Sequence, residues 1–249
     1  MKSGADGGGC FPTGRHYPGI AHLLRIVAAG LADECAGDSA TADIPLAAID
    51  TETTGRDPEV DRIVEIACVT WRNGTVVARH GWLVNPGRPI PKEATDVHGI
   101  KDEDVRDKPT FDQIAGEVVE ALRGSVPVAY NAEFDRAFLM AELARTSNVD
   151  PSPPPACRKG VEWIDPLVWA RELHKLEKSK ALGEVCARLG ITIAQAHRAT
   201  DDAEAALRVL SAFCEDVRVP KTYAALVQEQ RRLARLHDDE RKVWRARAN

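Results

Sequence analysis

Two carboxylates stand two residues apart, Asp50 and Glu52, in the segment IDTETTG at residues 49–55. They follow an apolar run, PLAAI, which is typical of a buried strand. Side chains at positions i and i+2 of a strand point to the same face, so both carboxylates are expected side by side at the strand's end. Adjacent anions repel each other, and a divalent cation with oxygen ligands relieves that repulsion. The alternative is a solvated acidic turn, because Thr-Gly after a strand is ordinary loop chemistry.

Two more acids and a histidine occur where the chain is expected to enter helices. Asp135 lies in the first turn after a short apolar run, and Asp202 comes five residues after His197 in HRATDD. A single Asp at a helix start usually caps that helix. Four carboxylates at strand ends and helix starts, with a histidine ahead of the last, favour a shared site over separate caps.

Alternating strands and helices must position these residues. Asn73-Gly74 is a strong hairpin signal between two β-branched runs. Gly124 and Gly190 follow two helical stripes and are expected to end them. Strands are predicted at residues 44–50, 62–71, 75–84 and 126–130. Helices are predicted at residues 111–123, 136–145, 181–189 and 220–249. Two more helices are predicted, one that begins at residue 165 and one within residues 197–209, after a polar loop. An initial meander followed by this alternation predicts an α/β domain with a mixed sheet.

Composition limits the partners and the location. The chain has 249 residues, is 44% hydrophobic and carries a formal charge of −5, so any nucleic-acid contact is expected to be local. No apolar run approaches the ~18 residues that span a membrane, and the N-terminus has no apolar signal segment, so a cytoplasmic protein without a membrane partner is expected. The six cysteines form no CxxC pair and are predicted to be reduced core residues.

The two ends of the chain differ from its middle. Residues 1–43 are predicted to form a glycine-rich arm with a short helix, and residues 44–216 contain all the acidic segments described above. Residues 217–249 are predicted to be a helical tail whose part from 220 onward has a net charge of +4. Such a tail can contact nucleic acid or an acidic partner, and a solvated helix face is the alternative.

Three segments resemble a known family. IDTETTG, YNAEFDRAFL and HRATDDAEAAL are similar to the three motifs of the DEDDh 3′–5′ exonucleases, which include the proofreading epsilon subunit of bacterial DNA polymerase III, RNase T and oligoribonuclease. VHGIKDEDVRDKPTF and WIDPLVWARELH resemble the epsilon-like members. The resemblance covers about residues 44–213. It implies an RNase H-like fold, with a five-stranded mixed sheet flanked by helices, and makes residues 44–216 an exonuclease domain.

The same resemblance implies a set of site residues. Two divalent ions, Mg²⁺ or Mn²⁺, are expected on Asp50, Glu52, Asp135 and Asp202, and His197 is expected to act as the general base. Substrate contacts are expected from residues beside the terminal sugar and base and at the strand-to-helix turn: Thr51, Thr53, His98, Ile100 and Asn131. The chain departs from many relatives in having Tyr130-Asn131 where they have His-Asn, a change expected to alter local packing without abolishing activity.

The implied activity is a metal-dependent 3′–5′ exonuclease that releases nucleoside 5′-monophosphates from single-stranded DNA, in proofreading or repair. Nucleic-acid 3′ ends are the expected partner, DNA being favoured over RNA, and a DNA polymerase subunit is a second candidate. An RNA exonuclease of the RNase T or oligoribonuclease type is an alternative, because discrimination would rest on contacts to the 2′-OH. A non-catalytic nucleic-acid-binding module is a third possibility, against which the complete set of four acids and a histidine argues.

Overall fold

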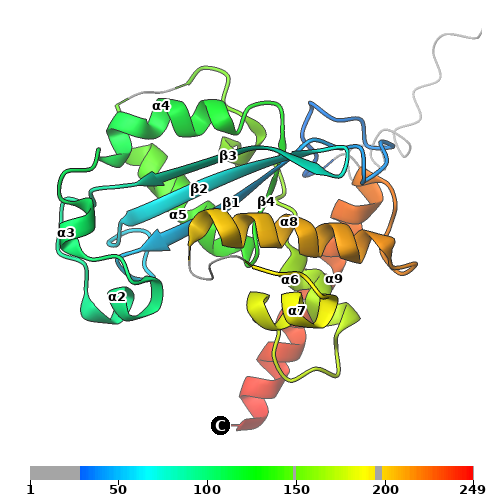
Figure 1. Cartoon of the computed structure of the whole chain (residues 1–249). Coiled ribbons are helices and arrows are strands. Elements are labelled where there is room, and N and C mark those ends of the chain that lie inside the picture. Colours follow the sequence, from blue (N-terminus) through cyan, green and yellow to red (C-terminus); the bar gives the residue numbers. More distant parts are fainter. Residues whose placement is uncertain (1–28, 148–149, 194–197, 249) are drawn as a thin grey trace, which may run out of the picture.

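A four-stranded mixed sheet forms the centre of the computed structural model, which describes residues 29–147, 150–193 and 198–248. The strands are β1 (Leu46–Thr53), β2 (Ile63–Arg72), β3 (Thr75–Leu83) and β4 (Val126–Val128), in the order β3-β2-β1-β4 (Figure 1). β1, β2 and β3 form an antiparallel meander, and β4 pairs parallel to β1. The predicted mixed sheet is therefore confirmed.

Among the described residues the sheet has four strands where five were expected. A single parallel bridge joins Ile164 to Val128, at the place where a fifth strand would begin. The chain does not continue as a strand there because the next residue, Asp165, caps a helix and Pro166 has no N–H to donate to a ladder. The hairpin between β2 and β3 turns at Asn73 and Gly74, whose φ angles of 49° and 79° match the predicted tight turn.

The helices follow the predicted stripes closely. They are α2 (Lys92–His98), α3 (Asp102–Val105), α4 (Phe111–Ala121), α5 (Ala132–Arg145), α6 (Pro166–Leu173), α7 (Leu182–Leu189), α8 (Ala199–Glu215) and α9 (Tyr223–Ala248), with a 3₁₀ turn η1 (Pro155–Cys157). α7 ends at Gly190, which has a φ of 68°. A residue with this left-handed conformation is the usual C-terminal stop of a helix, as the sequence predicted.

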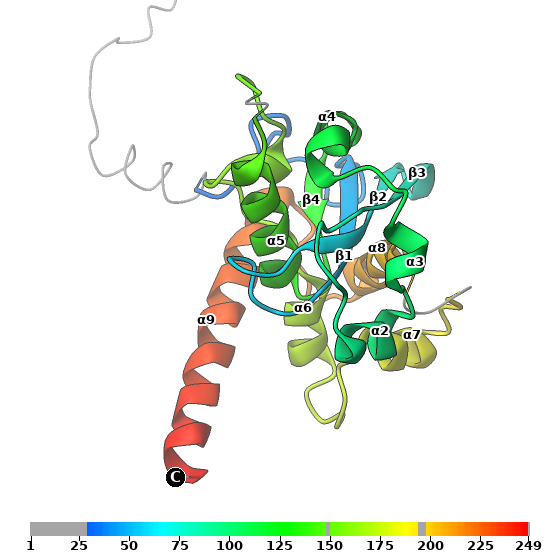
Figure 2. The ribbon, with the colours of Figure 1, turned by 90° about the vertical axis from the view of Figure 1, so that its left-hand side faces the viewer.

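Alternate residues of β1 bury opposite faces of the sheet. Leu46 and Ala48 belong to a core shared with α6, α7, α8 and α9. Ala47 and Ile49 belong to a second core, shared with α4 and α5. Figures 1 and 2 show α8 against one face and α4 with α5 against the other. This alternation decides which way the side chains at the end of β1 point.

The predicted C-terminal helix exists as α9, and its first half is part of the main core. Its first half contributes four buried side chains to the apolar cluster that also contains α8: Tyr223, Leu226, Val227 and Leu233. The Tyr223 hydroxyl also accepts a hydrogen bond of 2.9 Å from the Ala32 backbone N–H. Beyond the core, α9 extends past the body of the molecule (Figure 2).

Several predictions concern the ends and the cysteines. The short helix predicted within residues 1–43 lies almost entirely in residues 1–28, outside the described residues. Five of the six cysteines lie in the described part of the chain, and all five are free thiols. In the part of the chain that the structure describes, no helix is both long enough and apolar enough to cross a membrane.

Candidate active site

Three of the predicted acids meet at the carboxyl end of β1. Asp50 and Glu52 continue the alternation of Leu46 and Ala48, so they lie on the face of the sheet that α8 covers. Asp202 lies in the first turn of α8. One carboxylate oxygen from each of the three residues lies within 4.8 Å of the others. This donor set is the size and chemistry of a site for a hard divalent cation.

The fourth acid, Asp135, approaches the same strand end from the opposite face. It is buried on α5, and its Oδ1 accepts hydrogen bonds from Thr51, 2.9 Å from the backbone N and 2.8 Å from Oγ1. Thr51 points toward α5 because it lies between Asp50 and Glu52 on the strand. The four predicted acids therefore surround the end of β1, with Asp135 outside the group of three.

Burial and crowding change the acidity of this cluster. Burial, and next the charge of Asp135, raises the pKa of Asp50 well above 3.8. Burial, followed by the charge of Asp202, raises the pKa of Glu52 to about 8. Burial also raises the pKa of Asp135 to about 7, although the two hydrogen bonds from Thr51 favour its ionised form. The cluster is thus unfavourable as a set of bare anions, and protons or cations stabilise it.

A fifth carboxylate lies beside the cluster and was not among the predicted site residues. Glu65 is buried on β2 directly opposite Glu52 in the antiparallel register. Its Oε1 lies 2.8 Å from the guanidinium of Arg198, and its Oε2 accepts from the Ala199 N–H at 3.4 Å. This ion pair joins β2 to the first residues of α8 and so holds Asp202 near β1. A charged residue inside the apolar run IVEIACV was the available signal.

His197, the predicted base, lies outside the described residues. The neighbouring Arg198 and Ala199 are described, and both are bonded to Glu65. The chain next to His197 is therefore fixed to the sheet at the edge of the acidic cluster.

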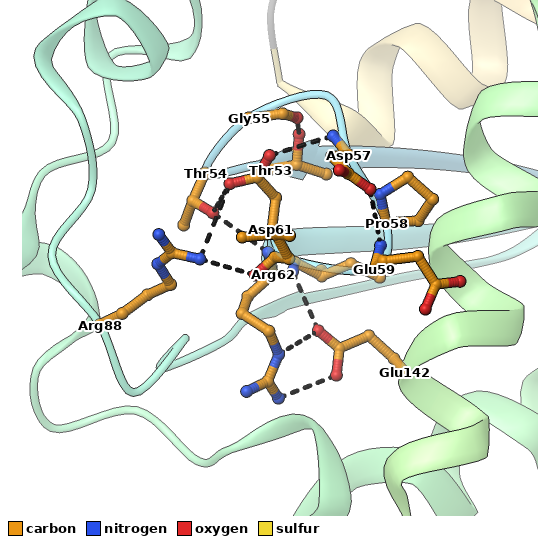
Figure 3. Close-up of polar contacts among 12 residues, drawn as sticks. Thr53, Thr54, Gly55, Asp57, Pro58, Glu59, Asp61, Arg62, Arg88 and Glu142 are labelled. Atoms are coloured by element: carbon orange, nitrogen blue, oxygen red, sulfur yellow. Dashed lines mark hydrogen bonds and ion pairs between the residues drawn. The ribbon is translucent and has the colours of Figure 1, made fainter.

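The loop after β1 is closed by a small polar network (Figure 3). Asp61 accepts hydrogen bonds from the Thr54 hydroxyl at 3.1 Å and from the Asp57 N–H at 3.0 Å. A Cβ atom on Gly55 would lie 2.2 Å from an oxygen of Asp61, so the glycine of IDTETTG is required by this close approach. The network gives the loop after β1 a defined shape.

A buried ion pair ties this loop to α5. Glu142, whose side chain is 1% exposed, accepts bonds of 2.7 and 2.9 Å from Arg62 and one of 3.2 Å from the Ile63 N–H (Figure 3). Glu142 and Asp135 lie seven residues apart on the buried face of α5. The pair consequently positions the helix that carries Asp135 relative to β1, and sequence patterning alone did not identify it.

Asn131 forms the strand-to-helix turn that was predicted for it. Its φ of 74° is left-handed, which asparagine tolerates better than most residues. Its N–H and that of Ala132 donate to Asp165 at 3.0 and 3.1 Å, and Asp165 also caps α6. The preceding Tyr130, which departs from the usual histidine, donates its hydroxyl to the Lys180 carbonyl. This hydrogen bond joins the strand-to-helix turn to the segment before α7, and the retention of activity with tyrosine here stays a prediction.

A cleft of about 780 Å³ opens beside the acids and contains most of the predicted substrate residues. Its wall includes Thr51, Thr53, His98 and Asn131. His98 Nδ1 accepts from the Ile100 N–H at 3.0 Å, which leaves the proton on Nε2, and this atom has no hydrogen-bond partner among the described residues. Burial lowers the pKa of His98, so the ring is neutral near pH 7.

Ile100 does not reach this cleft. Its side chain is 6% exposed and packs in a small apolar cluster with Val64, Ile90 and Val105. It contacts the site only through its N–H, which orients the His98 ring.

The sequence of this chain is similar to those of known exonucleases and DNA polymerase III proteins. A family model described as an exonuclease (RNase_T) matches residues 47–210. DNA polymerase III subunit epsilon of Treponema pallidum is 34% identical over 173 residues, which are 68% of this chain and 75% of that protein. The PolC-type DNA polymerase III of Thermotoga maritima is 34% identical over 178 residues. The match covers 72% of this chain but 12% of that protein, so the chain spans about an eighth of this longer relative.

Solved structures give the same result for the fold. Exonuclease X in complex with 5′ overhanging duplex DNA is 27% identical, with a TM-score of 0.54, and the match covers 73% of this chain and 99% of that chain. E. coli exonuclease I in complex with a dT13 oligonucleotide has a TM-score of 0.60 at 18% identity, covering 70% of this chain and 41% of that one. The expected RNase H-like arrangement of sheet and helices is thus confirmed.

Proposed function

Since the chain belongs to the RNase_T exonuclease family, we propose that it is a metal-dependent 3′–5′ exonuclease that releases nucleoside 5′-monophosphates from single-stranded DNA. The observation that carries this proposal is the group formed by Asp50, Glu52 and Asp202, whose carboxylate oxygens lie within 4.8 Å of one another. The raised pKa values of Asp50 and Glu52 mean that this group is stable only with bound protons or cations.

The donor set fits divalent cations with a preference for oxygen. Asp50, Glu52 and Asp202 would hold Mg²⁺ or Mn²⁺, with Asp135 completing a site for two ions. When bound, such ions stabilise the attacking and leaving oxygens of an in-line phosphoryl displacement. Asp135 keeps its orientation through Thr51, and Asp202 through the Glu65–Arg198 ion pair.

The remaining roles belong to the two histidines and the cleft. His197 takes the proton of the attacking water, since an imidazole with a pKa of ~6.5 accepts protons near neutral pH. His98, which lines the cleft, contacts the terminal nucleotide there. Thr51 and Thr53 line the cleft beside the sugar of the terminal nucleotide. Asn131 forms the strand-to-helix turn in the wall of the cleft. The Ile100 N–H orients the His98 ring.

DNA is the proposed substrate class on the strength of the relatives. Two of the similar solved structures are DNA complexes by name, and the two sequence relatives described above are DNA polymerase III proteins. The same relatives support the proposal that the chain acts beside a DNA polymerase in proofreading.

Direction, product and sugar preference are tested together with 5′-labelled 20-nucleotide single strands of matched DNA and RNA sequence. With Mg²⁺ we expect a labelled ladder that shortens from the 3′ end, faster digestion of DNA, and no reaction with excess chelator. The released nucleotides carry no label, so they are identified as nucleoside 5′-monophosphates by chromatography. Internal cuts, shortening from the 5′ end, or digestion in chelator would overturn the proposal. Faster digestion of RNA would reassign the substrate.

A further inference from the structure

Three clefts adjoin one another from the acidic cluster to the end of α9. The first is the substrate cleft described above, which has Asn131 in its wall. Asn131 also lines a second cleft of about 560 Å³ bounded by residues of α5, α6 and α9. Arg171 and Arg241 line both the second cleft and a third, of about 430 Å³, which ends at Trp244. The shared residues make one continuous path along the surface.

The third cleft is cationic although the whole chain carries a charge of −5. Arg171, Lys175, Lys180 and Arg241 line it, and Glu240 is the one acid among its lining residues in the described chain. In the second cleft charges of both signs are present, so positive charge is concentrated at the far end of the path.

Arg171 is the arginine of this cleft that lacks an ion pair among the described residues, since Arg241 pairs with Asp238. It is half-buried, and within the described residues no carboxylate lies at ion-pair distance from its guanidinium. Burial, and then the positive charge of Arg241, lowers the pKa of Arg171. Arg241 pairs with Asp238, but Arg171 faces the same cleft without an ion-pair partner among the described residues, so an added anion would stabilise it.

Trp244 supplies an aromatic surface next to these charges. It lies near the C-terminal end of α9 and is 71% exposed. An exposed indole beside arginine and lysine is the combination that binds single-stranded nucleic acid, by stacking a base while the cations contact the backbone phosphates.

We propose that α9, α6 and the residues around Lys180 bind the upstream part of a single-stranded DNA substrate, whose 3′ end occupies the acidic cleft. This inference rests on the proposed function and adds a second, non-catalytic contact region to it. The path along α9 from Gln230 to Trp244 is about 21 Å long, which corresponds to about six stacked nucleotides. Affinity should therefore depend on strand length.

The test compares KM for dT4 and dT15 in wild type and in Trp244→Ala. Wild type should have a KM for dT15 well below that for dT4. In Trp244→Ala the KM for dT15 should rise about tenfold, as expected for the loss of one base–aromatic stack. Val243→Ala is the matched control, because Val243 is 51% exposed on the same turn of α9 but does not line the cleft.

The charges are tested through the salt dependence of dT15 binding, measured with Ca²⁺ in place of Mg²⁺. Arg171→Gln and Lys175→Gln should each reduce the slope of log Kd against log salt by about 0.7, the value for one phosphate contact on a single strand. Lys242→Gln is the control, since Lys242 pairs with Asp239 and does not line the cleft.

The outcomes separate this inference from the proposed function. If wild type shortens both oligomers and the Trp244, Arg171 and Lys175 variants keep the wild-type KM and salt slope, the α9 contact is wrong and the exonuclease assignment stands. That outcome would leave the cationic surface for an acidic protein partner. If wild type shortens neither oligomer, the proposed function itself fails.

Discussion

Metal binding to this protein should release protons, and the number follows from the acidic cluster. With a pKa of about 8, Glu52 is protonated in about nine of ten metal-free molecules at pH 7. Asp50 has a pKa well above its usual value, and Asp135, with a pKa of about 7, is about half protonated. Because a cation binds these carboxylates only in their ionised form, filling the site with Mg²⁺ at pH 7 should release more than one proton, about 0.9 from Glu52 and about 0.5 from Asp135, with a further contribution from Asp50.

Isothermal titration calorimetry measures this number directly. Mg²⁺ is titrated into metal-free protein in two weakly metal-binding buffers of different ionisation enthalpy, such as PIPES and Tris, and the difference in observed heat gives the protons released. Glu52→Gln should release about one proton fewer than wild type. At pH 9 the wild-type value should fall, since Glu52 is then mostly ionised before the metal binds. No proton release at pH 7 would refute the electrostatic account of the cluster.

The same pKa shift gives the metal-free protein a characteristic pH dependence. Glu52 ionises near 4.5 in the unfolded chain and near 8 in the folded one, so between these values only the folded state holds the proton. The free energy of unfolding should therefore decrease as pH rises from 4.5 to 8, by at most about 5 kcal/mol from this group. Saturating Mg²⁺ should remove most of the decrease in melting temperature between pH 6 and pH 8.5.

Three substitutions test the surrounding contacts. Glu142→Gln leaves the Arg62 guanidinium without its buried partner and should cost about 3 kcal/mol of unfolding free energy in a denaturant titration; a loss below about 0.5 kcal/mol would contradict the positioning role of this pair. Thr51→Val removes one hydrogen bond from ionised Asp135 and should move the acidic limb of the kcat/KM profile about one pH unit upward, whereas an unmoved limb would show that Asp135 does not control it. His98→Ala removes a ring from the wall of the cleft and should raise the KM for single-stranded DNA up to about tenfold; a KM equal to that of wild type would exclude His98 from substrate binding.

Local patterning was sufficient to predict the strand that presents Asp50 and Glu52, because alternation along a strand fixes the face of every side chain. The same rule puts Thr51 on the other face, but only the docking of α5 reveals that Thr51 contacts Asp135. Asp135 therefore lies on the face of β1 that Thr51 occupies. Asp50, Glu52 and Asp202 form their group on the opposite face.

Long-range pairings could not be predicted from the sequence alone. Glu65 lies opposite Glu52 because of the antiparallel register, and its partner Arg198 is 133 residues away. In the tail, the basic composition left two interpretations open, a partner-binding helix and a solvated helix face. The apolar positions of α9, among them Tyr223, Leu226 and Leu233, instead join the main core, and only the exposed remainder is available to a partner.

The most direct test of the metal-dependent nuclease assignment compares Asp202→Asn with Asp201→Asn, its neighbour on α8, which lies outside the carboxylate group. Hydrolysis of a 5′-labelled single strand is measured at saturating Mg²⁺, together with the melting temperature of each protein without metal. Asp202→Asn should lose at least about a thousandfold in kcat while its metal-free melting temperature at pH 8.5 stays equal to or above that of wild type, because one repelling charge is gone. Asp201→Asn should keep wild-type turnover. Turnover within tenfold of wild type in Asp202→Asn would contradict the assignment.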